Sequence, residues 1–209
     1  RGGKVSILAP KKGQKERLVE LAHKNAALVL TQDAEKLRRE EERTLGAMQE
    51  IADLLGMSEV KRVESYDISN ISGFQSVGSM VVFENGKPKR SDYRKFKIKT
   101  VIGANDFASM KEVVNRRYSR MLVEAPDDLP QLVVIDGGEG QLEFARQALA
   151  ELGLMDRLMV IGLAKRMELV IRVNDPYPLF LDRNSQALKV LMHIRDEAHR
   201  FGITHHRDL

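Results

Sequence analysis

The order of strand-like and helix-like segments after residue 59 constrains the fold more than any other feature of this sequence. The segment Glu84-Asn85-Gly86-Lys87 contains an Asn-Gly pair, which marks a tight hairpin turn between two strand-like runs. Three strands that form an antiparallel meander, followed by alternating helices and strands, predict a mixed sheet covered by helices. The meander strands are expected at Val60–Tyr66, Ser76–Phe83 and Arg90–Lys97.

The alternating part is defined by apolar periodicity and by residues that start or stop helices. Leu132–Ile135 is a continuous apolar run, typical of a strand that is buried on both faces. Gly202 is expected to end the last helix, since glycine commonly terminates helices. The expected helices are Asp106–Val123, Gln141–Leu152 and Ser185–Phe201, and the other strands are Leu158–Ala164, Leu169–Val173 and Leu179–Leu181.

Residues 1–58 are expected to form an N-terminal helical segment that precedes the main domain. A short strand is predicted at Val5–Leu8 and a first helix at Gln14–Leu30. A second helix is expected to be capped by Thr31 and stopped by Gly56.

Composition limits the class of protein. The chain has 209 residues, of which 43% are hydrophobic and 31% charged, so residues 59–209 can bury a core in one domain. It begins at Arg1 rather than at methionine, so it looks like a piece of a longer protein. It has neither a run of about 20 apolar residues nor a signal segment, so we expect no membrane contact.

The absence of cysteine excludes a disulfide, a thiolate zinc site and a cysteine nucleophile. It fits the reducing conditions of the cytoplasm, which is the location we expect. Any metal ion would have to be held by Asp, Glu or His.

The positive charge is unevenly placed. The net charge is +4, but Lys87–Lys99 alone carries +6, so the rest of the chain is slightly negative. Arg116, Arg117 and Arg120 follow one another at the spacing of a single helix face. These groups indicate a polyanionic partner such as DNA or RNA. The alternative is a solvated face or a charged edge strand that blocks aggregation.

Two aspartates end predicted strands. Asp67 follows the first strand and Asp136 ends the buried one. If these strands are neighbours, both carboxylates meet at one sheet edge, where ligands gather in α/β folds. Adjacent carboxylates repel each other, and a divalent cation is the usual remedy. The alternative is that each Asp binds loop amides.

His199 lies beside the apolar stripe of the last helix, at the edge of the predicted core. A neutral imidazole in that place can ligate a metal ion or accept a proton. The alternative is a histidine that interacts with the helix dipole. His193, His205 and His206 are expected on the surface.

Asp106 has two interpretations, because Asn105 and Asp106 at the start of a helix are both good capping residues. The run from Asp136 to Gly140 could hold a phosphate at a helix N-terminus, but it lacks the Lys-Ser/Thr pair of a Walker loop.

Several motifs occur in an order that resembles one known family. They are YDISNISGFQSVGSMVVFENGKPKRSDYRKFKIKT, GANDFASMKEVVNRRYSR, LPQLVVIDGGEGQLEFA, IGLAK and PLFLDRNSQALKVLMHIRDEAHRFGITHHR. Together they resemble the C-terminal endonuclease half of the UvrC family, the incision subunits of bacterial nucleotide excision repair. The likeness runs over the whole chain. It implies a ribonuclease H-like fold whose Asp-Asp-His metal site cuts damaged double-stranded DNA on the 5′ side of a lesion.

The resemblance assigns roles to single residues. Asp67 of YDISN, Asp136 of VIDGG and His199 of RDEAH would hold Mg²⁺ or Mn²⁺, and Asp106 of GANDF matches a family position implicated in incision. The family's 3′-cutting module, its UvrB-binding segment and its helix-hairpin-helix pair have no counterpart here. Contact with UvrB, and with UvrA upstream, would therefore use parts of the protein outside these residues.

The mechanism we expect is hydrolysis of a phosphodiester with one firmly held metal ion. Backbone phosphates would be bound by a set of basic side chains without sequence readout. The set comprises Lys95, Lys97, Arg116, Arg117, Arg120 and Lys165. Two alternatives stay open: a non-catalytic nucleic-acid-binding domain on the same fold, and a ribonuclease H-like enzyme that acts on RNA hybrids or junctions.

Overall fold

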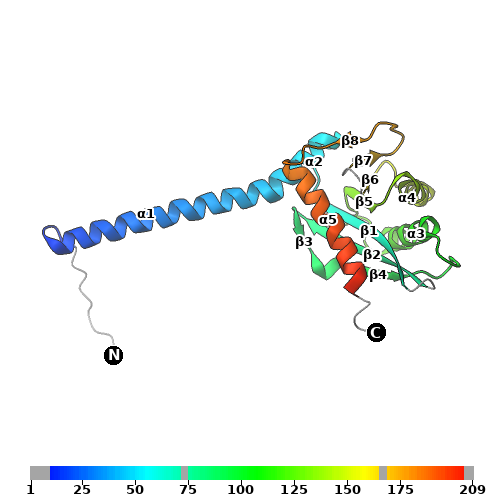
Figure 1. Cartoon of the computed structure of the whole chain (residues 1–209), viewed down its shortest axis with the longest axis horizontal. Coiled ribbons are helices and arrows are strands. Elements are labelled where there is room, and N and C mark those ends of the chain that lie inside the picture. Colours follow the sequence, from blue (N-terminus) through cyan, green and yellow to red (C-terminus); the bar gives the residue numbers. More distant parts are fainter. Residues whose placement is uncertain (1–9, 72–74, 165–168, 205–209) are drawn as a thin grey trace, which may run out of the picture. The chain divides into compact units, whose positions relative to one another are not determined.

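The computed structural model describes residues 10–71, 75–164 and 169–204 (Figure 1). The chain divides into two compact units, one ending at Glu42 and the other beginning at Arg43. The segment 1–58 is therefore shared between the units. The strand predicted at Val5–Leu8 lies outside the described residues. None of the described helices combines the length and the apolar character that a membrane crossing requires.

The first unit contains one long helix, α1 (Gln14–Glu41), in which no residue is buried. The predicted boundary at Thr31 is wrong. Thr31 Oγ1 donates a hydrogen bond to the Ala27 carbonyl at 2.9 Å, as in a helix interior. No glycine or proline occurs within α1 to interrupt the backbone hydrogen bonds.

A short π-helix, η1 (Glu42–Gly46), leads into α2 (Ala47–Leu55). The helix α2 ends at Gly56, whose φ of 67° is left-handed, as the sequence predicts. Ala47, Met48 and Ile51 of this helix are buried in the hydrophobic core of the second unit.

The second unit is built on a mixed sheet whose strand order is β3-β2-β1-β5-β6-β7-β8, with β4 also paired to β2. The strand β1 is antiparallel to β2 and parallel to β5, which is parallel to β6. This arrangement confirms the expected ribonuclease H-like mixed sheet. The strands are β1 (Arg62–Ile71), β2 (Gln75–Glu84), β3 (Lys87–Pro88), β4 (Arg94–Lys97), β5 (Leu132–Asp136), β6 (Met159–Ala164), β7 (Leu169–Arg172) and β8 (Leu179–Phe180).

The predicted third strand, Arg90–Lys97, is wrong in its first part, because Arg90–Asp92 form a 3₁₀ turn and the strand runs over Arg94–Lys97. The hairpin turn forms where expected, with φ of 52° at Asn85 and 76° at Gly86. After it come β3, a 3₁₀ turn η2 (Arg90–Asp92) and β4. Both strands pair with β2, so the chain leaves the sheet edge for one turn and returns.

Helices of the second unit cover both faces of the sheet (Figure 1). The helices α3 (Asp106–Glu124) and α4 (Glu139–Glu151) pack together on one face. The helix α5 (Gln186–Ile203) packs on β1, β2 and β5 and against α2 on the other face. Since side chains alternate along a strand, β1 directs Glu64 and Tyr66 toward α3, and Asp67 toward α5.

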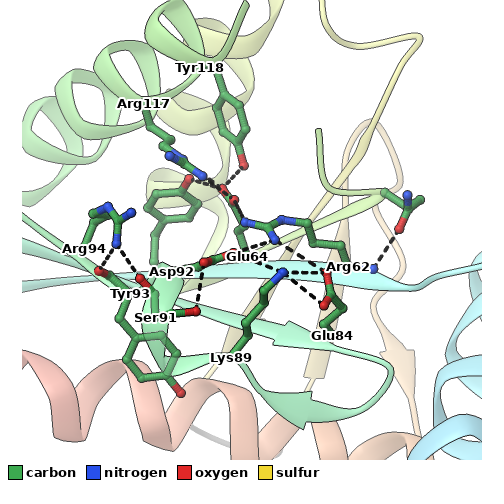
Figure 2. Close-up of polar contacts among 12 residues, drawn as sticks. Arg62, Glu64, Glu84, Lys89, Ser91, Asp92, Tyr93, Arg94, Arg117 and Tyr118 are labelled. Carbon is green, nitrogen blue, oxygen red and sulfur yellow. Dashed lines mark hydrogen bonds and ion pairs between the residues drawn. The ribbon is translucent and has the colours of Figure 1, made fainter. Parts of the chain in front are cut away.

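A charged network fills the space between β1 and α3 (Figure 2). Glu64 is fully buried, and its Oε2 accepts hydrogen bonds from the hydroxyls of Tyr66 and Tyr118 at 2.9 and 3.0 Å. Its Oε1 pairs with Arg117 at 2.8 Å and with Arg62 at 3.3 Å. Burial and the nearby carboxylate raise the pKa of both tyrosines well above 10.0, so both hydroxyls stay protonated and donate.

We expect Arg117→Met to lower the free energy of unfolding by about 3 kcal/mol, because it leaves part of a buried carboxylate uncompensated. Arg120→Met is the matched control, since Arg120 pairs with Glu124 on the exposed side of the same helix. The Arg120→Met variant should lose less than about 1 kcal/mol of unfolding free energy. Urea unfolding of both variants checks this. An equal loss of unfolding free energy in the two variants would show that the buried ion pair stabilises the protein no more than the exposed one.

Candidate metal centre

Asp67 lies inside β1, which continues to Ile71, so the prediction that it follows the first strand is wrong. Its side chain is only 5% exposed. Its Oδ2 accepts a hydrogen bond from Ser69 Oγ at 3.0 Å. Ser69 is two residues further along the strand and therefore shares its face. This bond holds one oxygen of the carboxylate in place.

Asp136 is the last residue of β5 and is also buried. The parallel pairing of the two strands includes Tyr66 opposite Ile135, so the next residues, Asp67 and Asp136, come side by side. The predicted meeting of the two carboxylates therefore occurs.

His199 comes from α5 on the same face of the sheet. Its Nδ1 lies 3.3 Å from Asp67 Oδ2, and its side chain is 47% exposed. Ligand atoms of Asp67, Asp136 and His199 all lie within 4.8 Å of one another, and among the described residues these three form the group with this property. A hollow of about 510 Å³ opens beside Asp136 and His199 and is also lined by Arg195, Asp196, Arg200 and Ile203.

Gly202 has a role that the sequence does not reveal, and the prediction that it ends the last helix is wrong. It lies inside α5, which continues to Ile203. A Cβ at this position would be 2.9 Å from Ser69 Oγ and 3.5 Å from Asp67 Oδ2. Glycine therefore lets the helix approach the carboxylate closely enough for His199 to reach it.

The C-terminal half of α5 is held at several points. Ser79, which pairs with Asp67 across the strands, donates from Oγ to the Ala198 carbonyl at 2.9 Å. Glu197 is buried and accepts a hydrogen bond from Tyr93 Oη at 3.1 Å. Its bonds to Arg200 lower the pKa of Glu197 although burial opposes this, so the carboxylate stays ionised and keeps both partners.

Sequence reasoning missed these supporting residues. Ser69 and Ser79 are short polar residues in strands, and Glu197 lies in a run of charged residues. Only the alternation of Ser69 with Asp67 along the strand could have indicated that the two side chains share a face.

Asp106 is the first residue of α3, and its neighbour Asn105 provides the cap by accepting a hydrogen bond from Ala108 N at 3.0 Å. The capping interpretation thus applies to Asn105. Asp106 is not among the three residues whose ligand atoms converge. Its proposed part in incision stays a prediction.

The predicted phosphate contacts differ in their surroundings. Lys95 and Lys97 lie on β4, and Lys95 pairs with Ser79, two strands away from Asp67 on the same face. Lys95 Nζ lies 4.7 Å from the centre of the Phe201 ring. Arg116 Nη1 donates to the Lys97 carbonyl at 2.8 Å and lies 3.0 Å from Glu112 Oε1.

Two of the remaining basic candidates pair with acidic side chains, and the third lies outside the described residues. Arg117 holds Glu64 in the core, where hydrogen bonding and attraction to that carboxylate raise its pKa despite burial. Arg120 is exposed and pairs with Glu124 at 2.8 Å. Lys165 lies outside the described residues.

The chemistry of the donor set fits a hard divalent cation. Two carboxylates suit Mg²⁺ or Mn²⁺, which prefer oxygen ligands, and Mn²⁺ also accepts an imidazole nitrogen. The three ligand atoms are close enough for one ion to touch them all. The half-exposed histidine leaves one side open for a substrate oxygen and water.

The fold and the convergent acids define a ribonuclease H-like domain with a candidate metal centre. Residues 52–203 match the family model described as the UvrC RNase H endonuclease domain. Residues 1–33 match a second model, described as the UvrC ribonuclease H-like domain. The chain belongs to the UvrC RNase H endonuclease domain family.

Curated relatives agree with this membership. The chain is 50% identical over 216 aligned positions to "UvrABC system protein C" of Lachnospira eligens, with 99% of this chain and 35% of the relative covered. It is 46% identical over 210 positions to the protein of the same name from Moorella thermoacetica, with 99% and 34% covered. The chain thus spans about a third of the length of these relatives.

Among solved structures, the fold is similar to human endonuclease V (ENDOV). The identity is 14% and the TM-score is 0.41, with 71% of this chain and 85% of the other covered. At this level the likeness supports no statement about activity.

We expect the chain to bind Mn²⁺, and Asp136→Asn to weaken that binding at least about tenfold, because one of the two anionic ligands is lost. Calorimetric titration measures this. Asp156→Asn, which changes an exposed acid elsewhere, is the control and should bind normally. Asp106→Asn should also bind normally. A loss in that variant would place Asp106 among the ligands.

Proposed function

We propose that this chain is the metal-dependent DNA endonuclease domain that makes the 5′-side incision in the damaged strand during nucleotide excision repair. The observation that carries the proposal is the convergence of Asp67, Asp136 and His199 within 4.8 Å. The family membership and the names of the relatives support the same pathway. The cofactor would be Mg²⁺ or Mn²⁺, and the protein would act in the cytoplasm.

The residues of the chain divide the chemical work. Asp67, Asp136 and His199 would hold one cation, which when bound polarises the scissile phosphate and lowers the pKa of a water molecule. Ser69 fixes one oxygen of Asp67, so that carboxylate cannot rotate away from its neighbour. Asp136 holds its place because the parallel ladder fixes the end of β5. Half-exposed His199 would orient the attacking water or complete the ligand set.

The DNA backbone would lie across β4 toward the metal centre. Lys95 and Lys97 are two residues apart on that strand, so both face the side of the sheet that carries α5 and the metal centre. Contacts of this kind position a duplex without reading its sequence. UvrB, with UvrA acting upstream, would deliver the damaged duplex through parts of the protein outside this chain.

Two other functions would use the same fold. A non-catalytic binding domain would keep the basic strand without needing three convergent ligands, and the metal centre argues against it. A nuclease for RNA–DNA hybrids or four-way junctions would keep the whole centre. Cleavage of lesion-containing duplex, hybrid and junction substrates in parallel separates these functions.

In the full-length protein with its partner subunits, Asp67→Asn or His199→Ala should lower the rate of 5′ incision about a thousandfold or more, because metal-assisted polarisation is lost. Gel analysis of a duplex with one lesion measures both cuts. DNA affinity should stay within about threefold, since these side chains contribute little phosphate binding. The 3′ cut, made by the other module, is the internal control. Loss of both cuts and of DNA binding would point to unfolding instead.

DNA binding should weaken steeply with salt, because phosphate contacts release counterions. Replacing Lys95 or Lys97 with Gln should each reduce the slope of log K against log salt by about 1. Lys61→Gln is the control, since Lys61 pairs with Glu59 before β1, at the opposite edge of the sheet. Fluorescence anisotropy at several salt concentrations gives the slopes. Salt-independent binding would contradict the assignment.

A further inference from the structure

The loop between β4 and α3 lies at the same sheet edge as the metal centre. The strand β4 is antiparallel to β2, which is antiparallel to β1, so β4 runs in the same direction as β1. Its cross-strand pairs place Lys95 level with Asp67 and Lys97 level with Ser69. The loop therefore begins just beyond the carboxylates, and α3 starts at that edge.

The loop is fixed at both ends. At its start, the Glu112 carboxylate accepts hydrogen bonds from the backbone N–H groups of Lys99 and Thr100, both at 2.9 Å. At its end, Asn105 caps α3. The hydrogen bonds from Thr100 and Lys99 lower the pKa of Glu112 against the effect of burial, so this anchor stays ionised.

Two large apolar side chains are held in solvent by this fixed loop. Ile102 is 98% exposed, and Phe107, in the first turn of α3, is 43% exposed. The Phe107 ring stacks on Phe144 with centroids 5.7 Å apart. It also lies over the first turn of α4, where a Cβ on Gly140 would be only 2.7 Å from Phe107 Cε1. Gly140 follows Asp136 by four residues, so the ring lies over the start of the helix that follows the turn after this candidate ligand.

The chain that leads into the loop of Ile102 is basic. Lys97 and Lys99 are exposed on the chain that leads into the loop, and Arg116 lies beside them through its bond to the Lys97 carbonyl. A protein partner with an apolar contact would not need these cations. A polyanion that also offers flat apolar surfaces does, and DNA with unstacked bases has both.

We propose that Ile102 and Phe107 form a contact site for an unstacked nucleobase beside the scissile phosphate. This inference rests on the proposed function and adds to it a preference for distorted over regular duplex. A regular duplex hides its base faces within the stack, whereas a distorted one offers them to apolar side chains. The basic side chains nearby bind both forms alike.

The test is equilibrium binding of the whole chain to two DNA duplexes that differ only in a central two-nucleotide mismatch bubble. Asp136→Asn is included throughout so that no DNA is cut. The expected result is that Ile102→Ala with Phe107→Ala weakens binding to the bubble about tenfold, in the range for loss of one aromatic stacking contact, and to the paired duplex less than twofold. A 2-aminopurine in the bubble should lose its fluorescence change in the same variant.

Val123→Ala is the matched control. Val123 is 84% exposed near the other end of α3 and should bind both duplexes normally. Ile102→Ala alone removes a side chain with almost no packing, so it keeps the test valid if the double variant unfolds. Equal binding of both DNAs by wild type and variants overturns the nucleobase site while leaving the endonuclease proposal intact. Failure of the wild type to bind either DNA overturns both.

Discussion

The parallel pairing of β1 with β5 is the constraint on which the metal centre depends. Asp67 and Asp136 are 69 residues apart in the sequence and become neighbours only because Tyr66 pairs with Ile135. A shift of that register by one residue would turn one carboxylate to the opposite face of the sheet. The buried apolar residues of β5 and the crossover through α3 hold the register, so core packing and candidate chemistry share one cause.

The strand β1 carries a buried carboxylate on each face, and the two carboxylates are compensated in different ways. Toward α3, Glu64 is neutralised within the protein by two arginines and two tyrosine hydroxyls (Figure 2). Toward α5, Asp67 receives one serine hydroxyl and a half-exposed histidine. A buried carboxylate with a complete set of partners supports structure, whereas carboxylates that meet at an open edge suit a cation from solution.

Side-chain contacts link the basic segment Lys87–Lys99 to the elements that carry the metal centre. Asp92 and Tyr93 are adjacent: Asp92 pairs with Arg62 at 2.8 Å, while Tyr93 bonds Glu197 and packs its ring on Phe201. One short turn is thus anchored both to β1 and to the helix that carries His199. Under the proposed function, phosphates bound on β4 would therefore be held at a fixed distance from the metal ligands.

The sequence by itself determined most of the elements, the mixed sheet and the three candidate ligands, because apolar periodicity, the Asn-Gly turn and an aspartate at the end of the buried strand are local signals. It placed Asp67 after the first strand, whereas β1 continues to Ile71. It was wrong at Thr31, at the third strand and at Gly202, because helix continuation, a brief departure from the edge and close helix approach depend on neighbours distant in sequence. It could not distinguish Arg117, which neutralises the buried Glu64, from Arg116 on the same helix. Only the tertiary structure decided which charged side chains are buried, which form ion pairs and which face solvent. The reason is that the role of a charged side chain depends on the residues it contacts, and many of these are distant in the sequence.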